Sequence, residues 1–423
     1  MFLKMGRKKK TGEEDSLKKL LHKAARPALL AMRVIGYMPN SISHQYEVTS
    51  RFCSIPFLWS VIVLAILLTG ASQLYENQRL LFKNKFITST MDKVCRLMVA
   101  WTFTLSSCGF GIKALLSMNA TKKFWSLNYL KLEELAQISQ QFDFRSAGFQ
   151  KLKRKITRST IKWTLIAGCF SFSMASLGAV VQSTMSSYAK VVNGSSNSSN
   201  DTVSEPKTSK SVSGRGFFLL IAMTASFLVA HLYMILSVYM CFFLQLYGSF
   251  LKAITTEMRE CRVPFVAGSH PYLVKVNSSS RCMPDMFTKK VKDCIRAYYI
   301  IKDLVDAFSR HFTVELTIVL LVSLITIITS AFFGMYHGFN DVRHHNWINM
   351  LTTFIRIMAY AVVLYAVASV STGLTRQADE FREELVRIDM DFVSTPMQAK
   401  VNRRPYGDFW QKLKALISDF LLP

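Results

Sequence analysis

Long apolar stretches alternate with shorter polar and charged stretches along this chain. A helix that crosses a bilayer needs about 20 apolar residues, and several stretches reach that length, such as CSIPFLWSVIVLAILLTGASQLY at 53–75. The pattern predicts an all-α protein, a polytopic transmembrane helical bundle. Its six predicted spans are 53–75, 97–118, 163–189, 216–248, 312–336 and 348–374.

The polar segments between these stretches show helical periodicity as well. Residues 126–142, 288–312 and 375–392 carry apolar side chains or acid–base pairs at helical spacing. The second of them runs directly into the fifth span and the third runs out of the sixth, so we expect helices that extend below the membrane. The predicted organisation has three parts. A cytosolic segment (1–51) precedes a six-span bundle (52–374), which contains two cytosolic helical loops (119–162 and 249–311). Cytosolic C-terminal helices follow (375–423).

Composition and charge give the bundle an orientation. The chain carries 52 Lys and Arg residues and a formal net charge of +25. A soluble protein with this charge would be a candidate for nucleic-acid binding, but here the basic residues alternate with membrane-length apolar runs, which excludes that class. Lys and Arg are enriched on the cytosolic side of membrane proteins, and one set of alternate segments holds 41 of them against 10 in the other set. This division predicts that both termini are cytosolic.

The stretch NGSSNSSNDT at 193–202 supports the same orientation independently. It contains three N-glycosylation sequons, at Asn193, Asn197 and Asn200, and a sequon is used only when its loop enters the secretory lumen. The loop between the third and fourth spans is non-cytosolic in the predicted topology. We therefore expect these asparagines to carry glycans, and the sequons at Asn119 and Asn277 to stay unmodified in cytosolic loops.

Motifs of enzymes and cofactor-binding proteins are missing from the sequence. It contains no Walker A loop, no G-x-G-x-x-G opening a helix, no H-E-x-x-H and no G-x-S-x-G. His337, His344 and His345 share a predicted outer loop, but without placed carboxylates they are more typical of a solvated polar cap than of a metal site. We expect no catalytic residues, no metal and no cofactor.

Ionisable residues inside the spans are the more informative candidates, because each costs about 2.5–3.5 kcal/mol near the bilayer centre. Arg356 lies in the outer half of the sixth span, and His231 lies near the middle of the fourth. Arg356 could form a structural pair, or it could line a wet cavity that is open to the outside. Glu315 lies near the cytosolic end of the fifth span, where simple anchoring at the interface is expected.

Aromatic and polar residues at a similar depth suggest a ligand pocket between helices. An interfacial aromatic belt explains Tyr188, Tyr336 and Trp347. The predicted ligand-binding residues are Gln182, His231, Phe333, Thr353 and Arg356.

The segment ARPALLAMRVIGYMPNS at 25–41 resembles the start of arthropod gustatory receptors, in which a short apolar helix precedes an R-x-x-G-x-x-P turn. Here that turn contains Arg33, Gly36 and Pro39. The helix entering the fifth span and FFGMYHGF at its outer end (332–339) are also similar to that family. The resemblance implies a chemoreceptor of the plasma membrane that is a ligand-gated cation channel, a tetramer around a central pore with a ligand pocket in each subunit's outer half. Its partners would be a small-molecule tastant, the lipid bilayer and other subunits in a homo- or hetero-tetramer.

One departure from the family concerns the pore. Gustatory receptors have seven spans, and the seventh contains T-Y-x-x-x-x-x-Q-F, which is missing from this sequence. The last stretch, FWQKLKALISDFLLP, is amphipathic and too short to cross a bilayer. We therefore expect either a truncated sequence or a variant without a pore helix.

Two other functions remain as alternatives. A G-protein-coupled receptor would have an external N-terminus, and the lysine-rich N-terminus and the missing D-R-Y-like and N-P-x-x-Y-like stretches argue against it. A secondary transporter would show internal repeats with broken helices, and no convincing repeat is found. The interpretation that the sequence favours is a chemosensory receptor.

Overall fold

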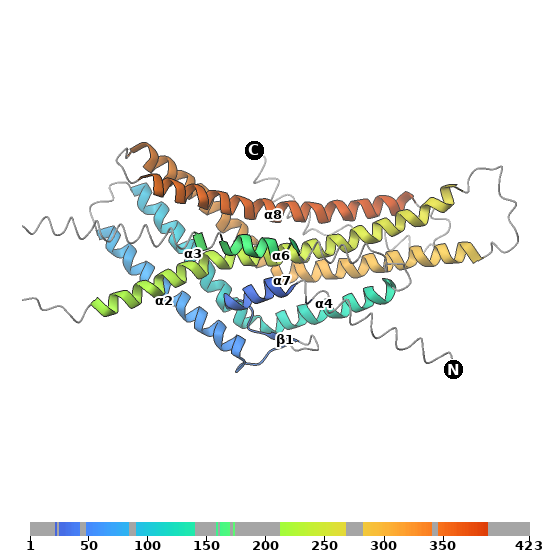
Figure 1. The fold of residues 1–423 in the computed structure, drawn as a ribbon, viewed down its shortest axis with the longest axis horizontal. Helices are drawn as coiled ribbons and strands as arrows, with labels where there is room; N and C mark the ends of the chain where they lie inside the picture. The colour runs from blue at the N-terminus through green and yellow to red at the C-terminus, as the bar shows by residue number, and fades with distance from the viewer. Residues whose placement is uncertain are drawn as a thin grey trace, which may run out of the picture.

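The computed structural model is an elongated bundle of long helices (Figure 1). It describes residues 22, 25–42, 48–83, 90–139, 158–159, 161–169, 172–173, 212–267, 282–340 and 346–387. Its long helices are α2 (Ile55–Lys83), α3 (Thr90–Leu116), α4 (Met118–Ser139), α6 (Val212–Ala267), α7 (Cys282–Asn340) and α8 (Asn346–Arg387). The prediction of an all-α bundle is confirmed. The described strands are β1 (Ser41–Ile42) and β2 (Val48–Thr49), which pair antiparallel with Ser41 opposite Thr49.

Three helices run through the whole length of the bundle. In Figure 1, α6, α7 and α8 follow the long axis, α2 and α3 accompany them in one half, and α4 accompanies them in the other. The continuous helices α7 and α8 agree with the expectation that cytosolic helices run into the fifth span and out of the sixth.

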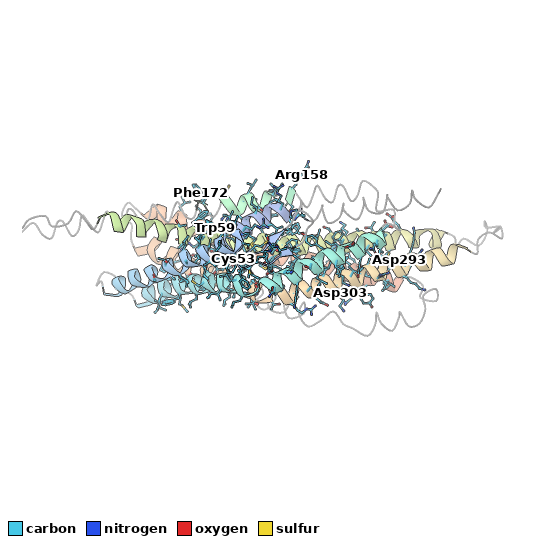
Figure 2. All side chains as sticks on the ribbon, turned by 90° about the horizontal axis from the view of Figure 1, so that it is seen from below. Cys53, Trp59, Arg158, Phe172, Asp293 and Asp303 are labelled. Carbon is cyan, nitrogen blue, oxygen red and sulfur yellow. The ribbon has the colours of Figure 1, made fainter. Side chains whose placement is uncertain are left out.

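The two halves differ in polarity. Figure 2 shows Trp59 and Phe172 in the half that contains α2, and Asp293 and Asp303 in the half that contains α4. Trp59 and Phe172 are exposed apolar side chains, as expected for a surface in lipid. In the other half, Lys131 of α4 lies 3.3 Å from a carboxylate oxygen of Asp303 in α7. The described parts of the two predicted cytosolic loops therefore lie together at one end of the bundle.

Four of the described helices are long and apolar enough to cross a membrane. Their stretches are Ile55–Ser72, Phe227–Glu260, Lys289–Met335 and Thr353–Leu385, while α3 contributes the shorter apolar stretch Thr104–Leu116. The third predicted span is described only at 161–169 and 172–173. Both the C-terminal end, 388–423, and the loop that carries the sequons lie outside the described residues.

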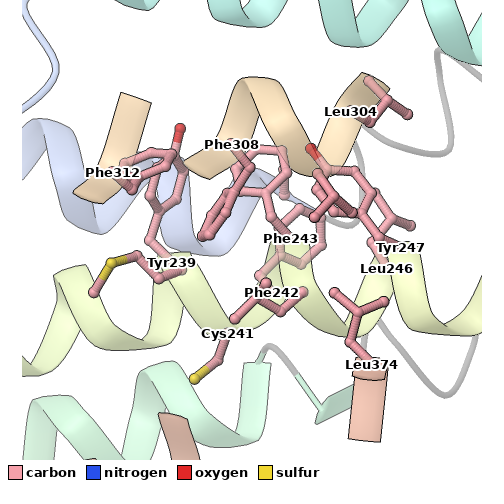
Figure 3. Packing of buried hydrophobic residues seen from close by; sticks show 14 of the residues in the cluster. Tyr239, Cys241, Phe242, Phe243, Leu246, Tyr247, Leu304, Phe308, Phe312 and Leu374 are labelled. Atoms are coloured by element: carbon pink, nitrogen blue, oxygen red, sulfur yellow. The ribbon is translucent and has the colours of Figure 1, made fainter. Parts of the chain in front are cut away.

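The centre of the bundle is an aromatic cluster at the junction of α4, α6 and α7. Phe243 of α6 lies among rings of α6 and α7, such as Tyr239 and Phe308 (Figure 3). Tyr239 lies 5.2 Å from it, and Phe124 of α4 lies 5.1 Å from it, between ring centroids. Polar tips inside this cluster are hydrogen-bonded. The Trp125 indole nitrogen donates to the Tyr239 hydroxyl at 3.1 Å. Rings of α4, which lies in the polar half, pack here against α6 and α7, which run through both halves. Edge-to-face ring pairs add attraction beyond the area they bury, so the cluster stabilises this junction.

Candidate functional site

The structure describes part of the predicted pocket. Gln182 and the sequon residues Asn193, Asn197 and Asn200 lie outside the described residues. The other four candidates are described, and each belongs to one of three local environments in the membrane half.

Phe333 and Thr353 lie at the contact between the outer parts of α7 and α8. A Cβ atom added to Gly334 would lie 3.3 Å from Cγ2 of Thr353, so the missing side chain of Gly334 lets the two helices approach. The ring of Phe333 meets Phe332 edge-on, with centroids 5.9 Å apart. Both Phe333 and Thr353 are partly buried. The structure therefore places Phe333 next in sequence to the point where Gly334 meets Thr353.

Arg356 begins a polar line that crosses the bundle. Its guanidinium is partly buried and forms no ion pair with any carboxylate of the described residues. One turn further along α8, the buried Tyr360 interacts electrostatically with both Arg356 and Tyr233 of α6. Tyr233 in turn packs against Phe110 of α3, with ring centroids 5.6 Å apart. The polar line therefore joins α8 to α6, and its inner end packs on a ring of α3. The sequence reasoning missed Tyr360 and Tyr233.

His231 occupies a third environment, on another face of α6. It lies two residues from Tyr233, which places the two side chains about 200° apart around the helix axis. Its ring stacks on Phe227 at 5.2 Å, and a Cβ atom on Gly168 would lie 4.0 Å from its Cε1 atom. Its buried Nδ1 atom has no hydrogen-bond partner among the described residues. His231 therefore faces the segment 161–169.

A cavity of about 200 Å³ lies between segment 161–169, α6 and α8. It begins about one helical turn from His231 and Arg356, at Met234 and Ala359, and extends toward the polar half of the molecule. The lining residues are Trp163, Ile166, Ala167, Met234, Ser237, Val238, Cys241, Phe242, Gln245, Ala359, Val362, Val363, Tyr365, Ala366, Ser369 and Val370. The sequence analysis selected none of them. The amide of Gln245 inside an apolar run was the available signal.

Glu315 corrects an interpretation made from the sequence. Instead of reaching the membrane interface, its side chain is fully buried and forms an ion pair with Lys113 of α3. The Tyr37 hydroxyl donates a hydrogen bond to the same carboxylate, and the Lys113 ammonium also donates to the carbonyl oxygen of His311 at 3.4 Å. The pKa of Tyr37 is raised well above its ordinary value, mainly by burial and secondly by the negative charge of Glu315. This phenol therefore stays a neutral donor.

Nothing in the described part of the chain fits a metal centre, since no group of three His, Cys, Asp or Glu residues there could hold an ion. The candidate site is a set of local environments between transmembrane helices.

Comparison with known proteins gives a family and a fold. The family model of the 7tm chemosensory receptors matches residues 25–404. Among solved structures, the chain is similar to the insect olfactory receptor OR5 from Machilis hrabei in complex with eugenol, with a TM-score of 0.50, 12% identity and 97% of each chain covered. A second structure of that receptor gives a TM-score of 0.51 and 11% identity, covering 94% of this chain and 96% of the other. No curated protein matches. At such identities, the structural likeness shows the fold alone.

Proposed function

This chain belongs to the family of 7tm chemosensory receptors, and on that premise we propose that it is a gustatory-type receptor, a subunit of a ligand-gated cation channel. It is a receptor rather than an enzyme. A small-molecule tastant binds between the outer parts of its helices and favours an open arrangement, because its affinity differs between the two states. The subunit works in the plasma membrane with both termini in the cytosol, in a homo- or hetero-tetramer.

The observation that carries this proposal is the polar line from Arg356 through Tyr360 to Tyr233. A charged side chain within a span is costly and usually faces the bundle interior or a water-filled cavity. Arg356 has no described carboxylate to neutralise it, and two buried tyrosines extend the polar surface inward. This arrangement can supply hydrogen bonds to a polar ligand, and Phe333 and Thr353 lie on the same helix pair, α7 and α8.

The test is cation current from cells that express the full chain, recorded with a panel of sugars and bitter compounds. For an active compound, Arg356→Ala should raise the half-maximal concentration at least about tenfold, as expected when a hydrogen bond to a charged group is lost. Arg356→Lys should retain part of the response.

Arg376→Ala is the matched control, because Arg376 lies on the same helix but is exposed, with its ion pair to Glu380 at the surface. Surface biotinylation measures delivery of each variant. If Arg356→Ala fails to reach the surface while Arg376→Ala does, the residue is structural and the pocket assignment is wrong. If a compound evokes another cellular response without any cation current, the channel function is wrong instead.

A further inference from the structure

The cavity between segment 161–169, α6 and α8 is separate from the outer site proposed above. Its lining residues in α6 lie between 234 and 245, and those in α8 lie between 359 and 370 and do not include Tyr360. Both sets lie closer to the polar half than Arg356 and Thr353 do. His231 faces segment 161–169 above the cavity without lining it. A second molecule could therefore occupy this cavity without touching the polar line.

The lining specifies the charge and size of an occupant. It contains no Lys, Arg, Asp or Glu, so no lining side chain would neutralise the charge of a bound ion. At about 200 Å³, it is smaller than the roughly 300–1,000 Å³ of sites for drug-sized ligands. Leaving an apolar cavity empty lowers stability in proportion to its volume. The cavity is therefore suited to a compact, uncharged and mainly apolar molecule.

Gln245 gives the cavity a directional polar group. The Ser159 hydroxyl donates to Oε1 of Gln245 at 3.4 Å, so the side-chain oxygen already has a partner. The amide NH₂ group remains as a donor of two hydrogen bonds. A bound molecule that carries a carbonyl or ether oxygen could accept one of these hydrogen bonds, whereas a hydrocarbon could not.

The cavity reaches the outer surface of α8. Tyr365, at its rim, is 74% exposed. Phe354 and Met358 are also exposed. Met358 follows Phe354 by four residues and precedes Tyr365 by seven, so all three side chains lie on one face of the helix. Exposed apolar side chains in a row are expected where a helix borders acyl chains. An occupant can thus reach the cavity from the bilayer.

We propose that this cavity is a second binding site, which takes a compact, uncharged, lipophilic molecule with one hydrogen-bond acceptor from the membrane and holds that acceptor on Gln245. The site goes beyond the proposed taste function, because its residues are distinct from the outer site.

Cys241 allows a direct test, because it lines the cavity and is a free thiol. Purified full-length receptor in lipid nanodiscs is treated with benzyl methanethiosulfonate, and modification at each cysteine is quantified by peptide mass spectrometry. Two probes of nearly equal size compete with the reagent: 4-phenylbutan-2-one, which has a carbonyl acceptor, and butylbenzene, which has none. Cys169, a free and exposed thiol, serves as the internal reference.

The ketone should protect Cys241 at about a three- to tenfold lower concentration than butylbenzene, the range expected for one hydrogen bond, and neither should protect Cys169. In Gln245→Leu this difference should disappear. Ala366→Phe, which fills the cavity, should abolish protection by both probes, whereas Ala361→Phe on the same helix lies outside the lining and should behave as wild type.

Equal protection by the two probes in the wild type, or an unchanged preference in Gln245→Leu, would overturn the role of Gln245. Protection that survives Ala366→Phe, or no protection at all, would overturn the site. If Ala366→Phe does not fold, the comparison with Gln245→Leu decides. Protection lost in Arg356→Ala would show that the ketone acts through the outer site, which overturns this inference while leaving the proposed taste function intact.

Discussion

Glu315 lies fully buried in α7, and its charge is stabilised by groups from two other parts of the chain. Lys113 belongs to α3, and Tyr37 belongs to the turn that follows the helical residues 25–34. Removing one partner of a buried ion pair leaves an uncompensated charge, which costs more than replacing both partners. This network therefore couples the N-terminal turn to the membrane bundle.

Lys113→Met should lower the free energy of unfolding by about 3–5 kcal/mol, since the carboxylate would stay buried alone. Adding Glu315→Gln to Lys113→Met should recover a large part of that loss, because the uncompensated charge is then removed. Unfolding by SDS in mixed micelles measures both variants, with Lys122→Met, at an exposed position, as the control. A double variant no more stable than Lys113→Met would argue against the ion pair.

Gly36 is the second residue on which this junction depends. It has a φ of +71°, in the left-handed region that favours glycine, and a Cβ atom there would lie 2.8 Å from Cβ of Val63 in α2. Gly36→Ala should therefore destabilise the protein by about 2 kcal/mol. Val63→Ala would remove the two methyl carbons at 3.0 and 3.1 Å but keep the Cβ atom at 2.8 Å and the backbone strain, so the pair should recover only a small part of the loss in the same SDS titration.

At the scale of elements, α2 and α6 approach through small residues. A Cβ atom on Gly70 would lie only 2.4 Å from Cβ of Ala225, so the two positions have room for one methyl group. Small residues at such crossings allow the close packing that drives association of transmembrane helices. The helix pair positions Tyr233 and His231 relative to the rest of the bundle, because both belong to α6.

Gly70→Ala should destabilise this crossing by about 1–3 kcal/mol through overpacking. The exchange Gly70→Ala with Ala225→Gly should restore most of the stability, since it moves the methyl group to the other helix. Gly373→Ala on α8, which would meet nothing within 4 Å, is the control. A stable Gly70→Ala variant measured in mixed micelles would show that the helices can move apart freely.

At the scale of the whole molecule, the central prediction is its orientation in the membrane. The described parts of the loops predicted to be cytosolic lie at one end, where α4 accompanies the polar parts of α6, α7 and α8 (Figure 1). Sidedness itself rests on the distribution of Lys and Arg and on the sequons. It determines which end of the bundle faces the ligand.

Glycosylation tests this orientation directly. Treatment with a peptide N-glycosidase should increase the gel mobility of the expressed receptor, and replacing Asn193, Asn197 and Asn200 with Gln should remove that shift. Asn119→Gln should leave the shift unchanged, because Asn119 lies in the first turn of α4, on the predicted cytosolic side. A shift that depends on Asn119 would reverse the topology.

The sequence by itself determined the fold class, the helical extensions of α7 and α8, and the resemblance that identified the family. These features are local, because hydrophobic length and periodicity are properties of consecutive residues. Only the tertiary structure decided which side chains meet. Glu315 pairs with Lys113 across 202 residues of chain, and Gln245 lines a cavity with Trp163 and Ser369. Such contacts depend on how helices cross and on how they are rotated about their axes. The hydrophobic period of a single helix does not determine either.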